Sequence, residues 1–182
     1  MPEWDDREIV EGIKRPGKEE LSFNMLVKKY QERLYWHIRK IVLTHEDADD
    51  VLQNTLIKVW KSLPGFRSDS TLFTWLYRIA TNEALTALKQ KKRRNLAPLD
   101  DLEQRMGEQL VSDPWFDGDQ AQLKLQQAIL KLPEKQRLVF NMKYFDDIKY
   151  EEMAGILDTS VGALKASYHH AVKKIEAMLG DN

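Results

Sequence analysis

The chain contains no cysteine, and this absence excludes a disulfide framework and any metal site built on thiolates. It has no apolar run that approaches the roughly 18 residues of a membrane-spanning helix. Three of its first six residues are acidic and none is basic, whereas a secretory signal begins with basic residues. With 4 histidines in 182 residues, a histidine metal cluster is also disfavoured. We therefore expect a cytoplasmic protein with no membrane insertion, no metal and no cofactor.

The chain also lacks an overall excess of either charge. It has 28 basic and 29 acidic residues, which give a net charge of −1. The distribution along the chain is uneven. Residues 1–94 hold 18 basic and 14 acidic groups, residues 95–119 hold 1 and 7, and residues 120–182 hold 9 and 8. A nearly neutral protein binds DNA weakly by itself, since non-specific affinity comes largely from neutralising phosphates. We expect either masking by the acidic segment or a larger partner that supplies affinity.

Apolar residues recur at helical spacing in two separate stretches of the chain. Residues 21–94 contain three amphipathic stripes, separated by a candidate N-cap at Thr44 and by the breaker Pro64-Gly65. Residues 132–179 contain further stripes. The pattern predicts an all-α protein of two small helical domains: an N-terminal domain of three or four helices at 1–94, an acidic flexible linker at 95–119, and a C-terminal four-helix domain with a helix-turn-helix at 120–182.

The C-terminal prediction depends on a short break between two stripes. Asp158 tolerates the left-handed backbone better than most residues, and Ser160 can cap the helix that follows. Such a tight break makes two helices cross sharply, as in a helix-turn-helix, although a plain helical hairpin has the same spacing. The outer face of the second helix favours DNA because it is rich in cations and donors before Glu176. Its polar groups are Lys165, Ser167, His169, His170, Lys173 and Lys174.

Three features of the N-terminal stretch exceed what a core needs. The second expected helix has an acidic, amide-bearing face, which either stabilises the helix start or docks a basic partner. Phe66, Phe73 and Tyr77 lie among arginines, as in proteins that stack unpaired bases, although they could simply widen the core. The polar loop 67–71 could hydrogen-bond an extruded base, and the basic run 89–94 favours phosphates.

Three stretches, 46–67, 70–94 and 132–175, resemble the extracytoplasmic-function class of bacterial RNA polymerase sigma factors. They occur in the family's order, with an acidic segment between the second and the third. The resemblance implies binding to core RNA polymerase and to promoter DNA, and control by an anti-sigma factor. It also implies a protein that is not an enzyme.

The resemblance carries three sets of residues to this sequence. Polymerase would be bound by Asp47, Asp50, Gln53 and Asn54, with Trp60 bracing the helix. The melted −10 element would be bound by Ser68, Asp69, Ser70, Thr71, Leu72, Phe73, Arg78, Thr81, Asn82, Thr86, Lys91, Lys92, Arg93 and Arg94. The −35 duplex would be contacted by Ser160, Lys165, Ser167, Tyr168, His169 and Lys173.

Three other functions compete with this interpretation, and the sequence supports them unequally. A stand-alone helix-turn-helix regulator would bind duplex DNA without polymerase, usually as a dimer. An adaptor would bind polymerase without reading DNA, but the cationic second helix argues against it. An enzyme lacks support because the sequence has no Gly-rich phosphate loop, and His45-Glu46 lacks the second histidine of a zinc protease helix.

Overall fold

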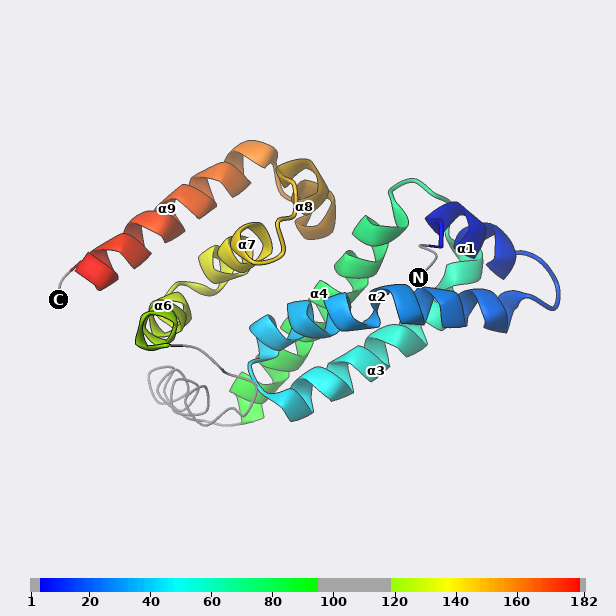
Figure 1. Cartoon of the computed structure of the whole chain (residues 1–182), viewed down its shortest axis with the longest axis horizontal. Coiled ribbons are helices and arrows are strands. Elements are labelled where there is room, and N and C mark those ends of the chain that lie inside the picture. Colours follow the sequence, from blue (N-terminus) through cyan, green and yellow to red (C-terminus); the bar gives the residue numbers. More distant parts are fainter. Residues whose placement is uncertain (1–3, 95–118, 181–182) are drawn as a thin grey trace. The chain divides into compact units, whose positions relative to one another are not determined.

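The computed structural model describes residues 4–94 and 119–180, and in this part of the chain every regular element is a helix (Figure 1). The chain divides into two compact units, residues 1–90 and 91–182, and each is considered by itself. The predicted all-α fold is confirmed. The expected linker falls outside the described residues, except for Asp119, which caps the next helix.

Within residues 4–94 the N-terminal unit has four α-helices and one 3-10 turn. They are α1 (Asp6–Ile13), α2 (Glu19–Val42), α3 (His45–Ser62), η1 (Leu63–Gly65) and α4 (Leu72–Arg94). Thr44 caps α3 as predicted, because its hydroxyl accepts the Asp47 N–H. Helix α1 was not predicted; it begins at an Asp5 side chain that accepts the Arg7 N–H.

The core of this unit is mostly apolar and includes a hydrogen-bonded cluster between two helices. Leu34, Ile38 and Leu76 are fully buried. Beside them, His37 Nε2 lies 2.8 Å from the Thr81 hydroxyl, which also donates to the Tyr77 carbonyl at 2.6 Å. These buried polar groups have hydrogen-bond partners, which offset the cost of removing them from water. The cluster therefore connects α2 to α4.

Helix α1 is fixed to α2 by a close approach and by a half-buried carboxylate. A Cβ added at Gly12 would lie 2.0 Å from Ser22 Oγ and 3.1 Å from Ser22 Cβ, so the approach depends on glycine at this position. Asp6 accepts the Tyr30 hydroxyl at 2.8–2.9 Å and Lys29 Nζ at 2.8 Å. Burial and the Asp6 carboxylate raise the pKa of Tyr30, so the phenol keeps its proton and donates it.

Within residues 119–180 the C-terminal unit has the helices α6 (Gln120–Leu130), α7 (Glu134–Tyr144), α8 (Tyr150–Leu157) and α9 (Val161–Gly180). Helix α9 packs on the other three. Ile129, Phe140 and Ala171 are buried in their common core, and the buried Arg137 donates to the Leu130 carbonyl at 3.0 Å.

The predicted helix-turn-helix break is confirmed in detail. Asp158 ends α8 with φ 50° and ψ 51°, in the left-handed region. The Ser160 hydroxyl then accepts the Ala163 N–H at 3.2 Å and caps α9. The break is therefore capped at both ends, and it sets the direction in which α9 leaves α8. No helix within residues 4–94 or 119–180 is both long and apolar enough to cross a bilayer.

Candidate nucleic-acid and polymerase interfaces

One side of α3 carries the predicted polymerase contacts. Asp50, Gln53 and Asn54 are exposed and recur at helical spacing with Ile57 and Trp60, which are 51% and 43% exposed. Five residues on one exposed face, two of them large and apolar, are more typical of a docking surface than of a solvated helix. We call these five residues the α3 face.

Two predicted members of this surface have local roles. Asp47 is half-buried, and its carboxylate accepts the Thr44 hydroxyl at 2.5 Å, so it belongs to the helix cap. The Trp60 ring meets the edge of Phe23 on α2 at 4.9 Å between centroids. Trp60 therefore braces α3 against α2 and also leaves part of its ring exposed.

The loop before α4 has a fixed and unusual backbone. Ser68 has φ 60°, a conformation that costs a non-glycine residue energy and that concentrates at functional sites. Thr71 caps α4, since its hydroxyl accepts the Thr74 N–H at 3.1 Å. Asp69 pairs with Arg67 at 3.5 Å, with both side chains highly exposed. The loop therefore presents short polar side chains on a backbone held at its end by a helix cap.

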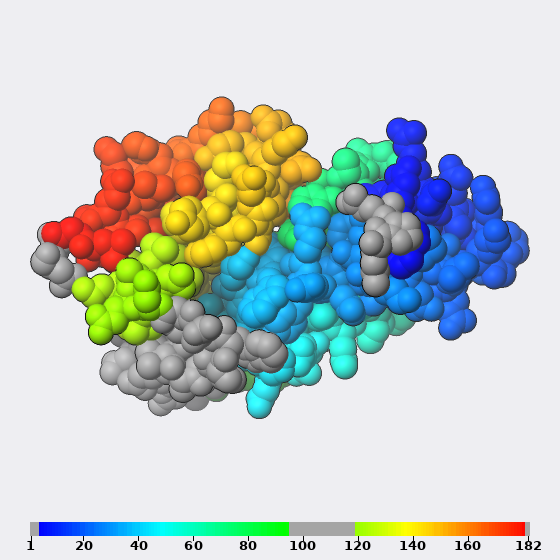
Figure 2. Space-filling model, in the orientation of Figure 1, coloured from blue at the N-terminus to red at the C-terminus, as the bar shows by residue number. Residues whose placement is uncertain are grey.

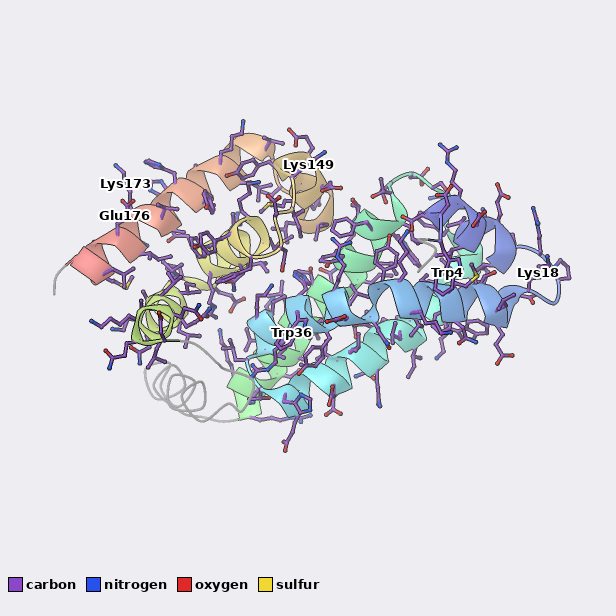
Figure 3. The ribbon with its side chains drawn as sticks, viewed as in Figure 1. Trp4, Lys18, Trp36, Lys149, Lys173 and Glu176 are labelled. Atoms are coloured by element: carbon purple, nitrogen blue, oxygen red, sulfur yellow. The ribbon has the colours of Figure 1, made fainter. Side chains whose placement is uncertain are left out.

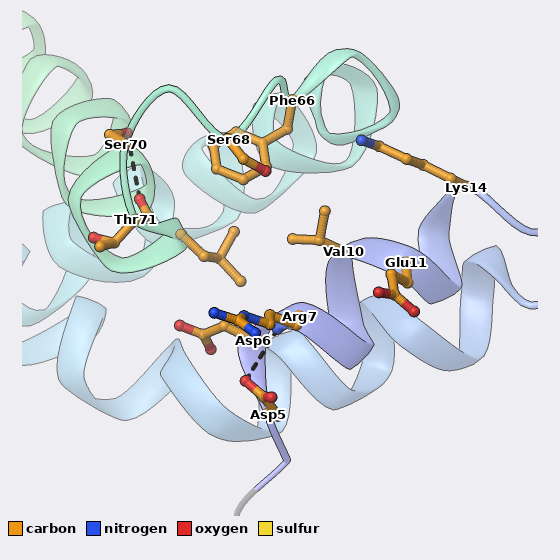
Figure 4. A pocket seen from close by; sticks show the side chains of 11 residues that line it. Asp5, Asp6, Arg7, Val10, Glu11, Lys14, Phe66, Ser68, Ser70 and Thr71 are labelled. Atoms are coloured by element: carbon orange, nitrogen blue, oxygen red, sulfur yellow. Dashed lines mark hydrogen bonds between the residues drawn. The ribbon is translucent and has the colours of Figure 1, made fainter.

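This loop forms one wall of a pocket of about 430 Å³, and α1 forms the other (Figure 4). The α1 wall consists of Asp5, Asp6, Arg7, Val10, Glu11 and Lys14. The opposite wall consists of Phe66, Ser68, Ser70, Thr71 and Leu72. Phe66 is buried, and its ring lies 5.0 Å from that of Trp75. The pocket thus joins two segments of the chain that are about fifty residues apart in the sequence.

An aromatic stack runs along the start of α4. The Phe73 and Tyr77 rings lie 4.2 Å apart between centroids, and Arg33 of α2 lies 5.0 Å from the Phe73 centroid. Tyr77 is buried, whereas Phe73 is half-buried and Arg33 is exposed. Phe73 therefore retains an accessible edge beside a cation, a combination suited to base stacking.

The predicted strand contacts on α4 separate into two groups. Arg78, Asn82 and Thr86 are exposed at every fourth residue and form one stripe, which we call the α4 stripe. Leu72 and Thr81 are 3% and 1% exposed. Their burial corrects the expectation that they contact DNA: Leu72 belongs to the core, and Thr81 bonds to His37 and Tyr77.

The basic run ends α4. Lys91 and Lys92 are half-buried, and Arg93 and Arg94 are exposed. All four lie in the last turn of the helix, where cations also favour the helix dipole. The run therefore has a stabilising role whether or not it contacts phosphates.

The outer side of α9 carries exposed Lys165, His169, His170 and Lys173, with Ser167 half-buried beside them. Lys173 points away from the rest of the unit (Figure 3), and α9 is open to the surface (Figure 2). Together with the Ser160 cap at the start of the helix, these residues form what we call the α9 face.

Tyr168 differs from the other predicted duplex contacts. Its ring stacks on Phe140 at 5.7 Å between centroids and packs against the core, and burial raises the pKa of its phenol. Tyr150, on α8, lies near Lys143 and Lys165, whose Nζ atoms are 5.4 and 5.8 Å from its ring centroid. Tyr168 is therefore mainly a packing residue, while Tyr150 helps to position Lys165.

Sequence reasoning missed Ile57, Arg33 and helix α1. Ile57 follows Asn54 by three residues, so the spacing of the α3 face already contained it. Arg33 could be connected with Phe73 only through the packing of α2 on α4. Helix α1 has only 8 residues and includes a glycine, but Asp5 followed by Ile9 and Ile13 was a usable sign of a capped amphipathic helix.

Comparison with known proteins assigns each unit to a family. Residues 26–94 match Sigma-70 region 2, and residues 122–175 match Sigma-70, region 4. The chain is 31% identical to the RNA polymerase sigma-H factor of Pseudomonas aeruginosa over 187 residues, covering 98% of this chain and 96% of the relative. It is 30% identical to the ECF RNA polymerase sigma-E factor of Salmonella typhimurium over 183 residues, covering 94% and 92%.

A solved structure has the same fold. It is the sigma factor RpoE of Bartonella quintana in complex with the anti-sigma factor NepR, with a TM-score of 0.67 and 20% identity. The similarity covers 87% of this chain and 96% of that one. The match therefore includes most of both helical units.

Proposed function

The chain belongs to the extracytoplasmic-function class of RNA polymerase sigma factors, which direct transcription initiation, and we propose that it divides promoter recognition between its two units. The N-terminal unit binds core polymerase and the melted −10 strand, and the C-terminal unit reads the −35 element as duplex. One observation carries this proposal: the α9 face and the loop 66–71 belong to different units.

Docking on polymerase is assigned to the α3 face. Asp50 supplies charge for a basic partner, and Ile57 and Trp60 supply apolar surface that is unfavourable in water. An aromatic residue beside polar groups is also the composition of an interface centre. These properties fit a stable, specific contact with a large protein.

Binding of separated DNA is assigned to the loop 66–71, the Phe73 edge and the α4 stripe. A strand without its partner offers unpaired base faces and phosphates. Phe73 with Arg33 suits a base face, while Arg78 suits a phosphate. Opening a base pair costs a few kcal/mol, so contacts of this number can favour melting at the correct sequence.

Duplex reading is assigned to the α9 face. A helix of this size fits the major groove, and its cations and hydroxyls can contact base edges and phosphates. The chain's net charge of −1 argues that polymerase supplies most of the general attraction to DNA. The chain itself then contributes more to the choice of promoter sequence than to the overall affinity for DNA.

We also assign an anti-sigma factor as a partner. RpoE of Bartonella quintana, which shares the fold, was solved with such a factor. Ile57 and Trp60 are exposed, so a partner that covers them would bury apolar surface when the chain is not bound to polymerase.

The assignment is tested by reconstituting the chain with bacterial core polymerase and mapping transcript starts. Asp50→Arg is expected to abolish co-purification with polymerase because it reverses a charge within the α3 face. Glu8→Arg is the matched control, since Glu8 is exposed on α1 and lies outside the α3 face. Equal binding by the two variants contradicts the docking assignment.

Lys165→Ala tests the duplex assignment. We expect transcription from the mapped promoters to fall about fivefold or more, with polymerase binding unchanged, because one base contact is worth about 1–3 kcal/mol. Lys124→Ala, an exposed lysine on α6, should have little effect. Equal losses for the two lysines would mean that α9 provides only general charge.

A further inference from the structure

We propose that His169 and His170 bind phosphates on the two sides of a DNA groove as protonated imidazoles, so that binding of the duplex takes up protons. The inference rests on the proposed function, because it assumes that the α9 face lies against duplex DNA. It names the chemical group that the two side chains contact and makes that contact depend on pH. It also gives a role to His170, which the expected −35 contacts leave out.

The two imidazoles point to different flanks of α9. Consecutive residues of a helix are about 100° apart around its axis, and the ring centroids of His169 and His170 lie 6.1 Å apart. Both residues are exposed, whereas Leu164, Ala171 and Ile175 bury the other side of the helix. A helix in the major groove has a phosphate backbone on each flank. The two rings therefore suit two different strands.

Each imidazole has lysines as its neighbours along α9. Residues four apart are adjacent on a helix, so His169 lies between Lys165 and Lys173. His170 lies one turn before Lys174. Like charges at this spacing repel each other. In the free chain these lysines therefore disfavour a proton on either ring.

Neighbouring acids do little to offset these lysines. Glu176, on the same helix, follows His169 by two turns, a rise of about 10 Å, which is more than the screening length in physiological salt. Helices α6, α7 and α8 pack on α9 from its buried side, and from α7 and α8 Lys143 and Tyr150 gather near Lys165. In the part of the chain that the structure describes, neither imidazole has a hydrogen-bond partner.

DNA reverses the preference of the free chain. Phosphates are anionic hydrogen-bond acceptors, so they favour the charged imidazole over the neutral one. Histidine gains or loses its charge between about pH 5 and pH 8. A complex that favours the protonated ring takes up a proton when it forms, so its affinity rises as the pH falls through this range. The lysines of α9 keep their charge in this range and cannot supply such a dependence.

The first experiment measures duplex binding as a function of pH. Core polymerase is combined with the wild type or with a chain that carries both His169→Gln and His170→Gln. The dissociation constant is measured on a duplex that ends before the −10 element, taken from a promoter mapped with the wild type. Glutamine keeps a hydrogen-bond donor but does not take up a proton. His45→Gln is the matched control, since His45 is exposed in the other unit, where it pairs with Asp49.

We expect the wild type to bind about fivefold or more tightly than the double variant at about pH 6, and nearly equally at about pH 8. The control should behave as the wild type does at both. At the lower pH, the double variant should also reduce the slope of log affinity against log salt by up to about 1.8, because each neutralised phosphate contributes about 0.9. If the wild type has the same advantage at both pH values, the inference is wrong.

The second experiment replaces the titrating ring by a permanent charge. His170→Lys should bind the duplex more tightly than the wild type at about pH 8, because lysine is charged there and histidine is mostly neutral. Its affinity should also change less between the two pH values. Weaker binding by His170→Lys at about pH 8 would mean that this position does not meet a phosphate, and it would overturn the inference.

Failure of the proposed function would look different from failure of this inference. If the wild type binds the mapped duplex no better than one with a scrambled −35 region, at either pH, the assignment of duplex reading to the α9 face fails and the inference fails with it. If the wild type distinguishes the two duplexes but the histidine variants leave the pH dependence unchanged, the inference alone is overturned.

Discussion

In the N-terminal unit the candidate contacts for a separated strand include a strained loop that lines a pocket, whereas in the C-terminal unit the candidate contacts for duplex lie along one helix. The pocket needs residues 5–14 and 66–72 to stay together, and α1 is fixed in place by its contacts with α2. The α9 face needs only the correct start and direction of α9. An unpaired base requires enclosure and a groove requires a protruding element, so the two sites depend on different parts of their units.

This difference predicts how each site should fail. Loss of packing within the N-terminal unit should disturb the pocket before any contact residue is changed. The α9 face should instead tolerate changes away from α8 and α9 and should depend on the cap between them. The three substitutions below test these dependences, from the largest expected effect to the smallest.

Leu34→Ala should lower the free energy of unfolding of the N-terminal unit by about 2–5 kcal/mol, because it creates a cavity at a fully buried position. Of the 5 tryptophans, Trp4, Trp36, Trp60 and Trp75 belong to this unit, so urea unfolding followed by tryptophan fluorescence reports chiefly on it. Leu21→Ala is the matched control, since Leu21 is on the same helix but 62% exposed. Similar losses for the two leucines contradict the described core.

Tyr30→Phe should lower the free energy of unfolding by about 1–3 kcal/mol, since it removes a hydrogen bond to the Asp6 carboxylate. It should also loosen α1, so hydrogen exchange should rise in residues 6–13 more than in α3. Equal protection of α1 in wild type and variant would mean that this bond does not hold the pocket wall.

The same variant has a pH signature. The pKa of Tyr30 is raised above its ordinary value of 10.0 in the folded chain, so the folded state keeps the proton that the unfolded state loses above that pH. The stabilisation by the hydroxyl is therefore complete below pH 10.0 and declines above it. The difference in stability between wild type and Tyr30→Phe should narrow by up to about 1.4 kcal/mol per pH unit there. A constant difference would contradict the raised pKa.

Ser160→Ala should lower the stability of α9 by about 0.5–2 kcal/mol because the first turn loses its cap. The effect should appear as faster hydrogen exchange of the Ala163 amide. Ser160→Asn should restore protection, since asparagine caps equally well. If neither variant changes exchange, the start of α9 is held by packing and not by the cap.

The helix-turn-helix of the C-terminal unit could be predicted from the sequence more fully than the pocket of the N-terminal unit. Asp158 and Ser160 act on their neighbours in the chain, so residue type and spacing were enough to predict the turn and the cap. The same is true of Thr44 at the start of α3. Local backbone chemistry can be read from a few consecutive residues.

The pocket could not be predicted in this way. Its α1 wall depends on the fit of Gly12 to Ser22 and on the pairing of Asp6 with Tyr30 across two helices. The prediction that Thr81 contacts DNA failed for the same reason. Only its contact with His37 on another helix shows that Thr81 is buried. Helical spacing gives the side of a helix on which a residue lies, but it does not say what covers that side.

The backbone at Ser68 has a consequence for engineering altered promoter choice. With φ at 60°, this position accepts glycine, asparagine and aspartate readily and penalises β-branched residues, whatever base is nearby. A library randomised at Ser68 would therefore select mainly for residues that tolerate this backbone conformation. Ser70, which lines the same pocket and does not share this backbone conformation, is the better codon to diversify, because enrichment there reports on the ligand.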